Sequence, residues 1–349
     1  MRPRSRLLAL AAVIAVAACT PSQSASPAPS EAASVGPSGA PTGELREVRL
    51  LLGFRPDVQF APFYLAQQTA LELPDGIDVT IEHASGGELI RLVADGQAEF
   101  GVADATDVMI ARTSGIPITY VSALYQLFPV ALIGPRGTVP TDPADLAGAR
   151  IGTPGRFGSS WHALLALLAA GGLTPDDVTI REYPQFNQVE GLLAGEVDFI
   201  TGFRSNEPLR LQAAGMPVDQ LTIDDIAPLP GPGLIASDEL IATDPRLVAL
   251  YAGSIVFAQQ DIDMYPSEGL AAAIEAVPTI AEDEETARAV LDATIPLWRG
   301  LPDPPGYYGL IDDELWRVGY DTMRSLGFID GSVPLEEMYE PFYRPVPTD

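Results

Sequence analysis

Apolar and polar positions between residue 46 and about residue 230 change repeatedly between strand-like and helix-like spacing. Short apolar runs such as "RLLLGF" and "VDFITGF" have the length of buried strands, and each precedes a polar loop and a stretch of apolar residues at helical spacing. Strands that alternate with helices form mostly parallel sheets, which bind ligands beyond the carboxyl ends of their strands. The pattern therefore predicts an α/β protein with its polar loops at a binding edge.

Two pairs of segments resemble each other within the chain. "VADGQAEFGVADATD" from Val93 corresponds to "LLAGEVDFITGFRSNE" from Leu192, since each reads as a helix end, a glycine, a short strand and a polar loop. Upstream of them, "REVRLLLGFRPDVQFAPFYLA" and "GARIGTPGRFGSSWHALLALL" both lead from a strand through a loop with glycine and proline into a helix. The repetition predicts two lobes of similar βαβ construction.

The expected lobes are discontinuous in sequence. The stretch "LFPVALIGPRGTVPTDPADLAGARIG", which passes through a strand and a proline-rich turn, favours a crossing from the first lobe to the second, and "APLPGPGLIASDEL" favours the return. We therefore expect lobe 1 to comprise residues 46–136 and 232–349, and lobe 2 to comprise residues 137–231. The returning chain has mostly helical spacing, and its Trp298 and Trp316 are expected to be packing residues.

The first residues have the features of an export signal. "MRPRSRLLALAAVIAVAAC" contains three arginines, an apolar run and small residues that end at Cys19. "VAAC" fits the lipobox of bacterial lipoproteins, which predicts a signal peptide over residues 1–18 and a lipid anchor on Cys19. Residues 19–45 are rich in Ser, Pro, Ala and Gly, which predicts a flexible linker outside the cell membrane.

Charge and residue usage exclude several classes of function. The formal net charge of −27 argues against nucleic-acid binding and against a basic membrane-binding patch. The chain has two histidines, His83 and His162, and one cysteine, which disfavours a zinc site and a Cys/His nucleophile. Phosphate-loop, dinucleotide-binding and nucleophile-elbow glycine patterns are missing from the sequence. We therefore expect an exported binding module without catalytic residues, metal or cofactor, and a monomer.

Several segments resemble the substrate-binding proteins of bacterial ABC importers. They are "LLGFRPDVQFAPFYLAQQTAL", "GIDVTIEHASGGELIRLVADGQAEFGVADATDVMIARTSGIPITYV" and "DLAGARIGTPG", and the likeness extends over residues 46 to about 270. More narrowly they resemble the branch that binds pyrimidine precursors of thiamine and, in some bacteria, riboflavin. The resemblance implies a two-lobed periplasmic-binding-protein type II fold, with a ligand cleft between lobes that are mostly parallel sheets flanked by helices. It also implies an ABC permease as partner.

The first loop of that branch is typically Trp-x-Pro-Asn-x-Asn-His. Here it runs from Phe54 to Phe60, so that Gln59 takes the place of asparagine and Phe60 that of histidine. The resemblance thus implies Phe54, Gln59 and Phe60 as ligand contacts, with more aromatic surface than a single pyrimidine ring requires. Asp104 and Tyr125 are further candidates from lobe 1, together with Gln126, because their segments lie near strand ends.

The second lobe contributes a Gly-Tyr-x-x-x-Glu motif in that branch. Gly202, Phe203 and Glu207 match its spacing, with phenylalanine in place of tyrosine, and Asn206 precedes the glutamate. Glu207 is either a ligand contact stabilised by hydrogen bonds or a surface glutamate in the first turn of a helix, which Asn206 helps to cap.

The loop "TPGRFGSSW" opens another helix of lobe 2. Its Ser159 and Ser160 are either hydrogen-bond donors to an oxygen-rich ligand group or helix caps. Trp161 either stacks on a heterocycle or packs within its own lobe. A phosphate or a sugar-alcohol chain fits such a loop.

The aromatic residues and polar loops together favour riboflavin as the ligand. A pyrimidine precursor of thiamine, such as hydroxymethylpyrimidine or formylaminopyrimidine, is the alternative. A sulfonate or nitrate is disfavoured because Glu207 would repel an anion. A pyrimidine-synthesising enzyme of the related fold would need histidine where this chain has Phe60.

Overall fold

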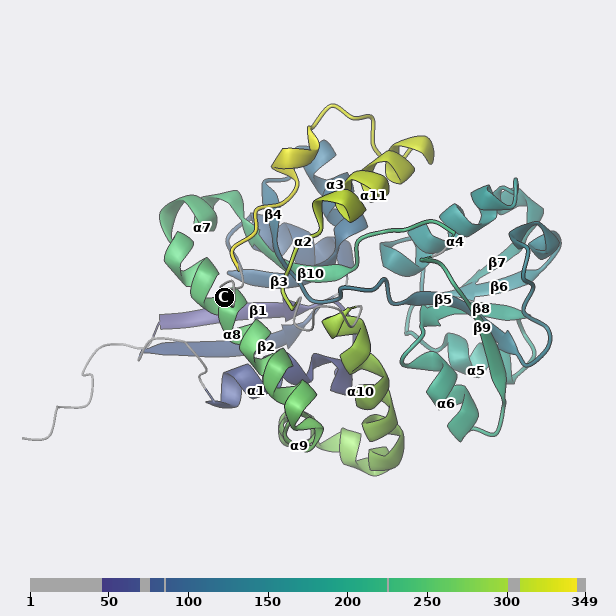
Figure 1. Ribbon diagram of the computed structural model, residues 1–349, viewed down its shortest axis with the longest axis horizontal. Coiled ribbons are helices and arrows are strands. Elements are labelled where there is room, and N and C mark those ends of the chain that lie inside the picture. Colours follow the sequence, from purple (N-terminus) through teal and green to yellow (C-terminus); the bar gives the residue numbers. More distant parts are fainter. Residues whose placement is uncertain (1–45, 70–75, 85, 225, 301–307, 344–349) are drawn as a thin grey trace, which may run out of the picture. The chain divides into compact units, whose positions relative to one another are not determined.

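The computed structural model describes residues 46–69, 76–84, 86–224, 226–300 and 308–343. These residues form two lobes, each built on a five-stranded sheet (Figure 1). The expected signal peptide over residues 1–18, the lipidated Cys19 and the linker over residues 19–45 lie outside the described residues. None of the helices that the structure describes is long and apolar enough to cross a membrane.

The first lobe begins with alternating strands and helices. In chain order these are β1 (Arg46–Leu52), the 3-10 turn η1 (Val58–Phe60), α1 (Ala61–Thr69), β2 (Ile77–His83), α2 (Gly86–Ala94), β3 (Phe100–Asp104), α3 (Ala105–Thr113) and β4 (Ile118–Ala123).

The second lobe repeats this alternation. It contains β5 (Val130–Pro135), η2 (Pro143–Leu146), β6 (Arg150–Thr153), α4 (Gly158–Ala170), η3 (Pro175–Asp177), β7 (Thr179–Glu182), α5 (Gln188–Leu193), β8 (Phe199–Phe203), α6 (Glu207–Ala213) and β9 (Val218–Thr222).

The chain then returns to the first sheet and continues as helices. These elements are β10 (Pro232–Ser237), α7 (Asp238–Thr243), α8 (Pro245–Met264), α9 (Pro266–Ala276), η4 (Pro278–Asp283), α10 (Glu284–Arg299), α11 (Asp313–Ser325) and η5 (Leu335–Glu337). The Asp244 carboxylate caps α8 by accepting the Leu247 N–H at 3.0 Å, and Pro266, two residues after the end of α8, begins α9.

The two sheets have equivalent strand orders. The first is β2-β1-β3-β10-β4 and the second is β7-β6-β8-β5-β9. β1 pairs in parallel with β2 and β3, and β6 pairs in parallel with β7 and β8. One strand in each sheet is antiparallel to both its neighbours, namely β10 in the first and β5 in the second. The expected α/β class and the two similar lobes are confirmed.

The expected first crossing between the lobes is wrong by one strand. β5, at Val130–Pro135, was expected in lobe 1 but pairs with β8 and β9 in the second sheet. The proline-rich stretch after it is a turn within lobe 2, because Arg136 N–H donates to Pro217 O at 3.0 Å and Gly137 N–H donates to Asp219 Oδ2 at 2.7 Å. The return lies where it was expected, since β10 begins at Pro232.

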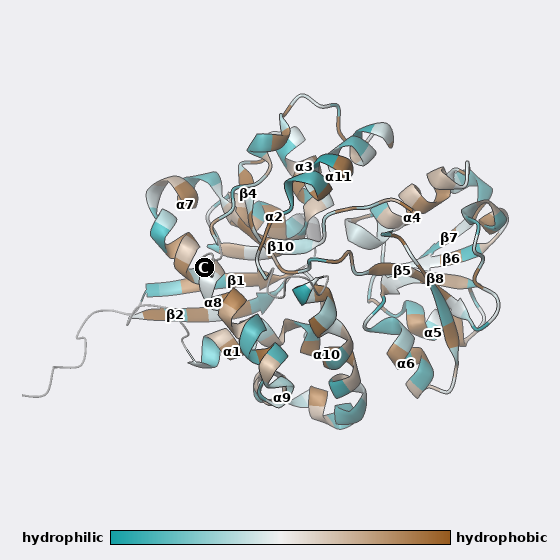
Figure 2. Ribbon diagram, in the orientation of Figure 1, coloured by the Kyte–Doolittle hydropathy of each residue, from teal (hydrophilic) through white to brown (hydrophobic). Residues whose placement is uncertain are grey.

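Helices cover both faces of each sheet, which explains why inner strands such as β5 and β10 read as nearly continuous apolar runs. In β1, Leu50 and Leu52 pack on the side of α1, α8 and α10, whereas Leu51 packs on the side of α2, α3 and α11. In β5, Leu132 packs toward α4 and Ile133 toward α5 and α6. Figure 2 shows hydrophobic residues along β5 and β8, and the hydrophilic colours lie on helices and loops outside the sheet.

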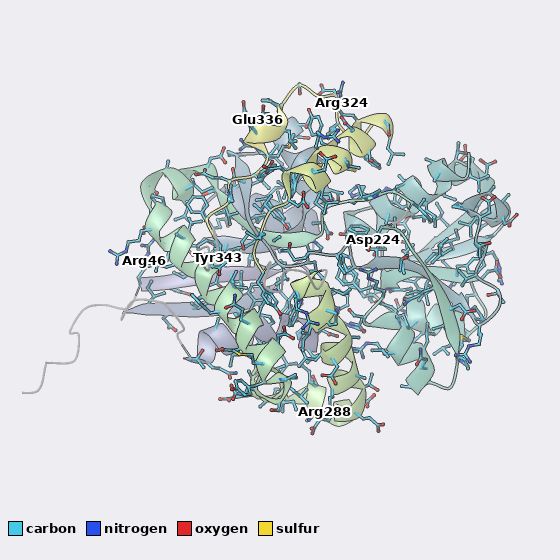
Figure 3. All side chains as sticks on the ribbon, viewed as in Figure 1. Arg46, Asp224, Arg288, Arg324, Glu336 and Tyr343 are labelled. Atoms are coloured by element: carbon cyan, nitrogen blue, oxygen red, sulfur yellow. The ribbon has the colours of Figure 1, made fainter. Side chains whose placement is uncertain are left out.

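Both tryptophans of the helical tail are packing residues, as expected. Trp298 is 0% exposed within the cluster of α1, α8 and α10, and Trp316 is 1% exposed in the cluster on the opposite side of the sheet. The Trp316 ring lies edge-on to Tyr120 with centroids 4.9 Å apart. Charged groups such as Arg288 and Glu336 lie on the outside of lobe 1 (Figure 3).

Candidate ligand-binding site

One pocket is lined by loops of both lobes at the carboxyl ends of their strands. Nine of the eleven expected ligand-binding residues line it, namely Phe54, Gln59, Phe60, Asp104, Tyr125, Ser159, Ser160, Phe203 and Glu207. Its other lining residues include Asp107, Phe157, Phe186 and Gln188. The pocket is therefore the candidate site.

Aromatic rings from both lobes meet around this pocket. Phe54 of lobe 1 lies edge-on to Phe186 of lobe 2, with centroids 4.7 Å apart. Tyr125 of lobe 1 lies edge-on to Phe203 of lobe 2, with centroids 5.7 Å apart. Phe60 also lines the pocket and packs into the lobe 1 core. These rings offer flat apolar surfaces to a planar ligand.

Phe186 has an uncommon backbone conformation. Its φ is 57°, and among the described residues it is the one residue other than glycine in the left-handed region. Phe186 N–H donates to Tyr183 O at 2.9 Å, which closes a tight turn between β7 and α5. A bulky side chain in this region is strained, and such strain is characteristic of binding sites. The turn places the Phe186 ring in the pocket.

Glu207 is buried in the pocket wall and is not a surface residue. It is 5% exposed, its Oε2 accepts the Phe203 N–H at 2.7 Å, and its Oε1 accepts Gln188 Nε2 at 3.3 Å. Burial raises the pKa of this carboxyl from 4.5 to about 7, although hydrogen bonds from the N–H groups of Glu207 and Phe203 oppose the rise. Glu207 therefore exchanges its proton near neutral pH.

Gly202 makes room for this carboxyl. A Cβ added at residue 202 would lie 2.7 Å from Cγ and Cδ of Glu207, which is closer than such atoms approach. Because β8 ends next to Gly202, the Glu207 side chain can fold back over the strand to reach the Phe203 N–H. The glycine and the glutamate of the motif are thus in direct contact.

Two further carboxyl groups reach across the cleft to the start of α4. Asp104 Oδ2 accepts the Ser159 N–H at 2.9 Å, and its Oδ1 accepts the Ser159 hydroxyl. Asp107, with a side chain 16% exposed, accepts the Gly158 N–H. Burial raises the pKa of both aspartates, and the charge of Asp104 raises that of Asp107 further.

Gly158 allows this approach. Its φ of 69° favours glycine, and a Cβ added there would lie 2.7 Å from Asp104 Oδ2. His162, one turn further along α4, contacts Thr106 Oγ1 through Nδ1 at 2.9 Å. Burial lowers the pKa of His162 to about 4, so the ring is neutral and its 3.8 Å distance to Asp107 is not an ion pair.

A second set of hydrogen bonds crosses the cleft between η1 and α6. Asp57 Oδ1 accepts the Gln59 N–H and caps η1, while its Oδ2 accepts Arg210 Nη2 at 2.7 Å. Gln59 Oε1 accepts Asn206 Nδ2 at 2.6 Å, and Gln59 Nε2 donates to Ser205 Oγ at 3.2 Å. We call the Asp57, Gln59, Ser205, Asn206 and Arg210 set the cross-lobe clasp. It joins the two lobes beside the pocket.

Two expected ligand contacts do not line the pocket. Trp161 is 7% exposed and packs in the core of lobe 2, with the Arg156 guanidinium 5.0 Å from its ring centre. Asn206 is 1% exposed and belongs to the cross-lobe clasp. Of the weaker candidates, Gln126 also lies elsewhere, since its Nε2 donates to Leu310 O at 3.1 Å.

Phe186, Gln188 and Asp107 were not anticipated. Phe186 and Gln188 lie in "EYPQFNQ", which runs from the end of β7 to the first residue of α5, at the same strand-to-helix position as the loops that were recognised. Both would have been found if every segment that follows a strand had been taken as a candidate ligand contact. Asp107 stands one helical turn after Asp104 in α3, so helical spacing was its indication.

The side chains of the pocket are not arranged as a metal site. Across the described residues no group of three or more His, Cys, Asp or Glu side chains is placed to hold a metal ion. The arrangement instead offers aromatic surfaces, carboxyl acceptors and closure of two lobes. Such a site suits reversible capture of a planar ligand with hydrogen-bond donors.

Comparison with known proteins agrees with this geometry. The family model described as NMT1/THI5 like matches residues 57–252, which is more than half of the chain. The chain belongs to the NMT1/THI5-like family. It is 29% identical over 343 residues to the riboflavin-binding protein RibY of Chloroflexus aurantiacus, covering 97% of each chain. It is 28% identical to the 4-amino-5-hydroxymethyl-2-methylpyrimidine phosphate synthase of Schizosaccharomyces pombe, over 58% of this chain and 61% of that protein.

Solved structures show the same fold. The periplasmic aliphatic sulphonate binding protein SsuA of Escherichia coli superposes with a TM-score of 0.67 at 14% identity, covering 87% of this chain and 94% of that chain. The alkanesulfonate-binding protein SsuA of Xanthomonas axonopodis also gives a TM-score of 0.67, at 18% identity, over 86% of this chain and 99% of that chain. The expected two-lobed periplasmic-binding-protein type II fold is confirmed.

The raised pKa of Glu207 predicts a pH-dependent contribution to stability. Between pH 4.5 and about 7 the folded protein keeps a proton that the unfolded chain releases, so the contribution of Glu207 falls as pH rises. The free energy of unfolding of Glu207→Gln, measured in urea, should therefore rise relative to that of the wild type as pH increases through this window. The expected change is up to roughly 3 kcal/mol. Glu336→Gln, on the surface, is the control. A difference that does not change with pH would contradict the assignment.

Crowding at Gly202 predicts that alanine there displaces Glu207. We expect Gly202→Ala to lower the free energy of unfolding by about 1–3 kcal/mol, as overpacking does. Gly253→Ala is the matched control, because a Cβ at that buried position in α8 meets nothing within 4 Å. Thermal unfolding measures both. A Gly202→Ala protein as stable as Gly253→Ala would show that the contact is absent.

The cross-lobe clasp predicts that removal of Arg210 favours separation of the lobes. Asp57 is 3% exposed, so Arg210→Ala leaves a buried carboxylate without its cation and destabilises the closed arrangement by about 1–3 kcal/mol. Small-angle X-ray scattering should then show a larger radius of gyration. Arg288→Ala is the control, since Arg288 and its partner Glu284 are both about half exposed. Identical scattering from the two variants would count against the clasp.

Proposed function

We propose that the chain is the substrate-binding component of an ABC importer and that it binds riboflavin outside the cell membrane. The observation that carries the proposal is the pocket between the lobes, with aromatic rings from both sides and carboxyl groups along its wall. The likeness to RibY over 97% of both chains supports riboflavin as the ligand. The likeness to solved import-system binding proteins supports the fold that such a role requires.

The chemistry of riboflavin suits the lining of the pocket. Its isoalloxazine is a flat, uncharged ring system that can lie against Phe54, Phe186 and Phe203. Its ring N–H and ribityl hydroxyl groups are hydrogen-bond donors, and carboxyl groups accept such bonds strongly. Contacts from both lobes would stabilise the closed form, which the permease would recognise. Binding involves no chemical step.

The N-terminal sequence supports attachment to the membrane. We propose that Cys19 carries the lipid and that residues 19–45 connect it to the lobes, so that the protein acts as a monomer at the extracytoplasmic face. The net charge of −27 disfavours direct adhesion to anionic lipid, which leaves the anchor as the means of retention.

A pyrimidine precursor of thiamine is the second candidate ligand. The family and the glutamate motif favour it, but one pyrimidine ring would contact fewer of the aromatic residues in the pocket. Sulfonate and nitrate fit the pocket poorly, because the described residues that line it include no arginine or lysine and the Gly158 and Ser159 N–H groups already donate to Asp107 and Asp104.

An enzymatic role is disfavoured. Neither His83 nor His162 lines the pocket, and Phe60 stands where the related pyrimidine-synthesising enzymes need histidine. His83 instead contacts the Phe54 carbonyl through Nδ1, and His162 contacts Thr106.

Titration of the mature protein tests the proposal. We expect riboflavin to quench tryptophan fluorescence with an affinity of about 1 μM or tighter, which corresponds to about −8 kcal/mol. Calorimetry with hydroxymethylpyrimidine and formylaminopyrimidine provides the comparison. Binding of either pyrimidine without binding of riboflavin would reject the ligand that we propose.

A further inference from the structure

The carboxyl groups of the pocket fall into two groups with different surroundings. Glu207 lies with Gln188 on lobe 2, and its pKa responds to the charges of Asp57 and Arg210. Asp104 and Asp107 lie on lobe 1 against the start of α4, and the pKa of Asp107 responds to the charge of Asp104. The pocket thus has two chemically distinct ends.

The start of α4 would be an anion-binding site if its N–H groups were free. The first turn of a helix has N–H groups without helical partners, and these favour phosphate or sulfate. Here the Gly158 N–H donates to Asp107 and the Ser159 N–H donates to Asp104. The carboxyl groups of lobe 1 therefore occupy the positions that the oxygens of an anionic ligand would take.

These two aspartates retain acceptor capacity that faces the pocket. A carboxylate has about four acceptor sites. Asp104 accepts two bonds from Ser159, and Asp107 accepts one from Gly158, while both residues line the pocket. Ser160 also lines the pocket beside them, and its side chain is partly exposed. Donors from a ligand would stabilise this end of the pocket.

We propose that Asp104, Asp107 and Ser160 form a subsite for a neutral hydroxyl-bearing chain of the ligand and exclude the same chain when it carries a phosphate group. This inference rests on the proposed function, in which the hydroxyl-bearing chain of the ligand is the ribityl group of riboflavin. Hydroxyl groups donate to the carboxylates. A phosphate, with about −1.5 to −2 charges at neutral pH, needs donors or a cation. The N–H groups at this end already donate to the aspartates, and no arginine or lysine lines the pocket in the described part of the chain, so burial of a phosphate is unfavourable.

The other end of the pocket then takes the ring system. Gln188 is 1% exposed and lines the pocket, its Nε2 donates to Glu207, and its Oε1 has no partner among the residues that the structure describes. Phe186, two residues before it, lies against Phe54. Substitutions at Glu207 are therefore expected to weaken contacts with the ring system of the ligand. Substitutions at Asp107 are expected to weaken contacts with its ribityl group.

Three flavins separate these contributions. Riboflavin carries the hydroxyl chain, riboflavin 5′-phosphate carries the same chain with a phosphate, and lumiflavin has a methyl group in its place. In fluorescence titrations of the wild-type full chain, we expect riboflavin 5′-phosphate to bind at least about 100-fold more weakly than riboflavin. Lumiflavin should bind about 10-fold more weakly, because it lacks the hydroxyl donors.

Two variants then assign the effect to the subsite. Asp107→Asn should weaken riboflavin binding about 10-fold, leave lumiflavin within about 2-fold and reduce the preference for riboflavin over its phosphate at least 10-fold. Ser160→Ala should weaken riboflavin alone, and it provides a second test should Asp107→Asn fold poorly. Asp176→Asn is the charge-matched control, because Asp176 is exposed in η3 away from the pocket lining.

A third variant tests contacts that do not involve the ribityl group. Glu207→Gln should weaken riboflavin and lumiflavin by the same factor and leave the preference over the phosphate unchanged. Equal binding of riboflavin and its phosphate to the wild type would overturn the inference while leaving the proposed function in place. Equal losses of riboflavin and lumiflavin in Asp107→Asn would also overturn it. Failure of every flavin to bind would overturn both the proposed function and the inference that rests on it.

Discussion

Burial of carboxyl groups between the lobes is the constraint on which the cleft depends. Asp57, Asp104, Asp107 and Glu207 all lie there, and Asp57 alone of these four forms an ion pair with an arginine within the described part of the chain. A carboxylate removed from water without compensation is strongly unfavourable. Each of the other three must keep its proton or accept hydrogen bonds, and the donors to Asp104 and Asp107 belong to the opposite lobe.

This constraint connects closure of the lobes with the choice of ligand. When the lobes separate, water can solvate the Asp104 and Asp107 carboxyl groups, and when they close, α4 and the contents of the pocket must replace that water. An anion would add charge to an already acidic pocket, whereas a neutral molecule with O–H and N–H groups supplies what the carboxyl groups need. In the function that we propose, the same side chains stabilise closure and select the ligand.

Much of the site could be predicted from sequence because it repeats a local rule. Phe54, Asp104, Ser159 and Phe203 all lie at the ends of strands or in the segments that follow them, and the carboxyl ends of parallel strands converge in such a fold. Glu207 was assigned through the spacing of a motif, and the contact between its carboxyl and Gly202 explains why that spacing involves glycine.

What could not be predicted depends on contacts between distant segments. The pairing of Asp57 with Arg210 joins residues 153 positions apart, and neither residue carries a local sign of its partner. Trp161 begins a helix next to two pocket residues, yet the direction of its side chain is set by the packing of lobe 2. The assignment of β5 to lobe 1 was wrong because a proline-rich turn and a crossing between lobes have the same composition.

The cross-lobe clasp has a consequence for how affinity arises. A ligand that binds only the closed form has an apparent affinity reduced by the fraction of protein that is closed, so any interaction that favours closure strengthens binding without touching the ligand. The hydrogen bonds of Gln59 with Asn206 and of Asp57 with Arg210 are of this kind, since they involve protein groups alone. If they raise the closed fraction from about one hundredth to about one half, they contribute roughly 50-fold in affinity. The aromatic and carboxyl groups of the pocket can then discriminate among ligands, because part of the free energy of closure is already supplied by the clasp.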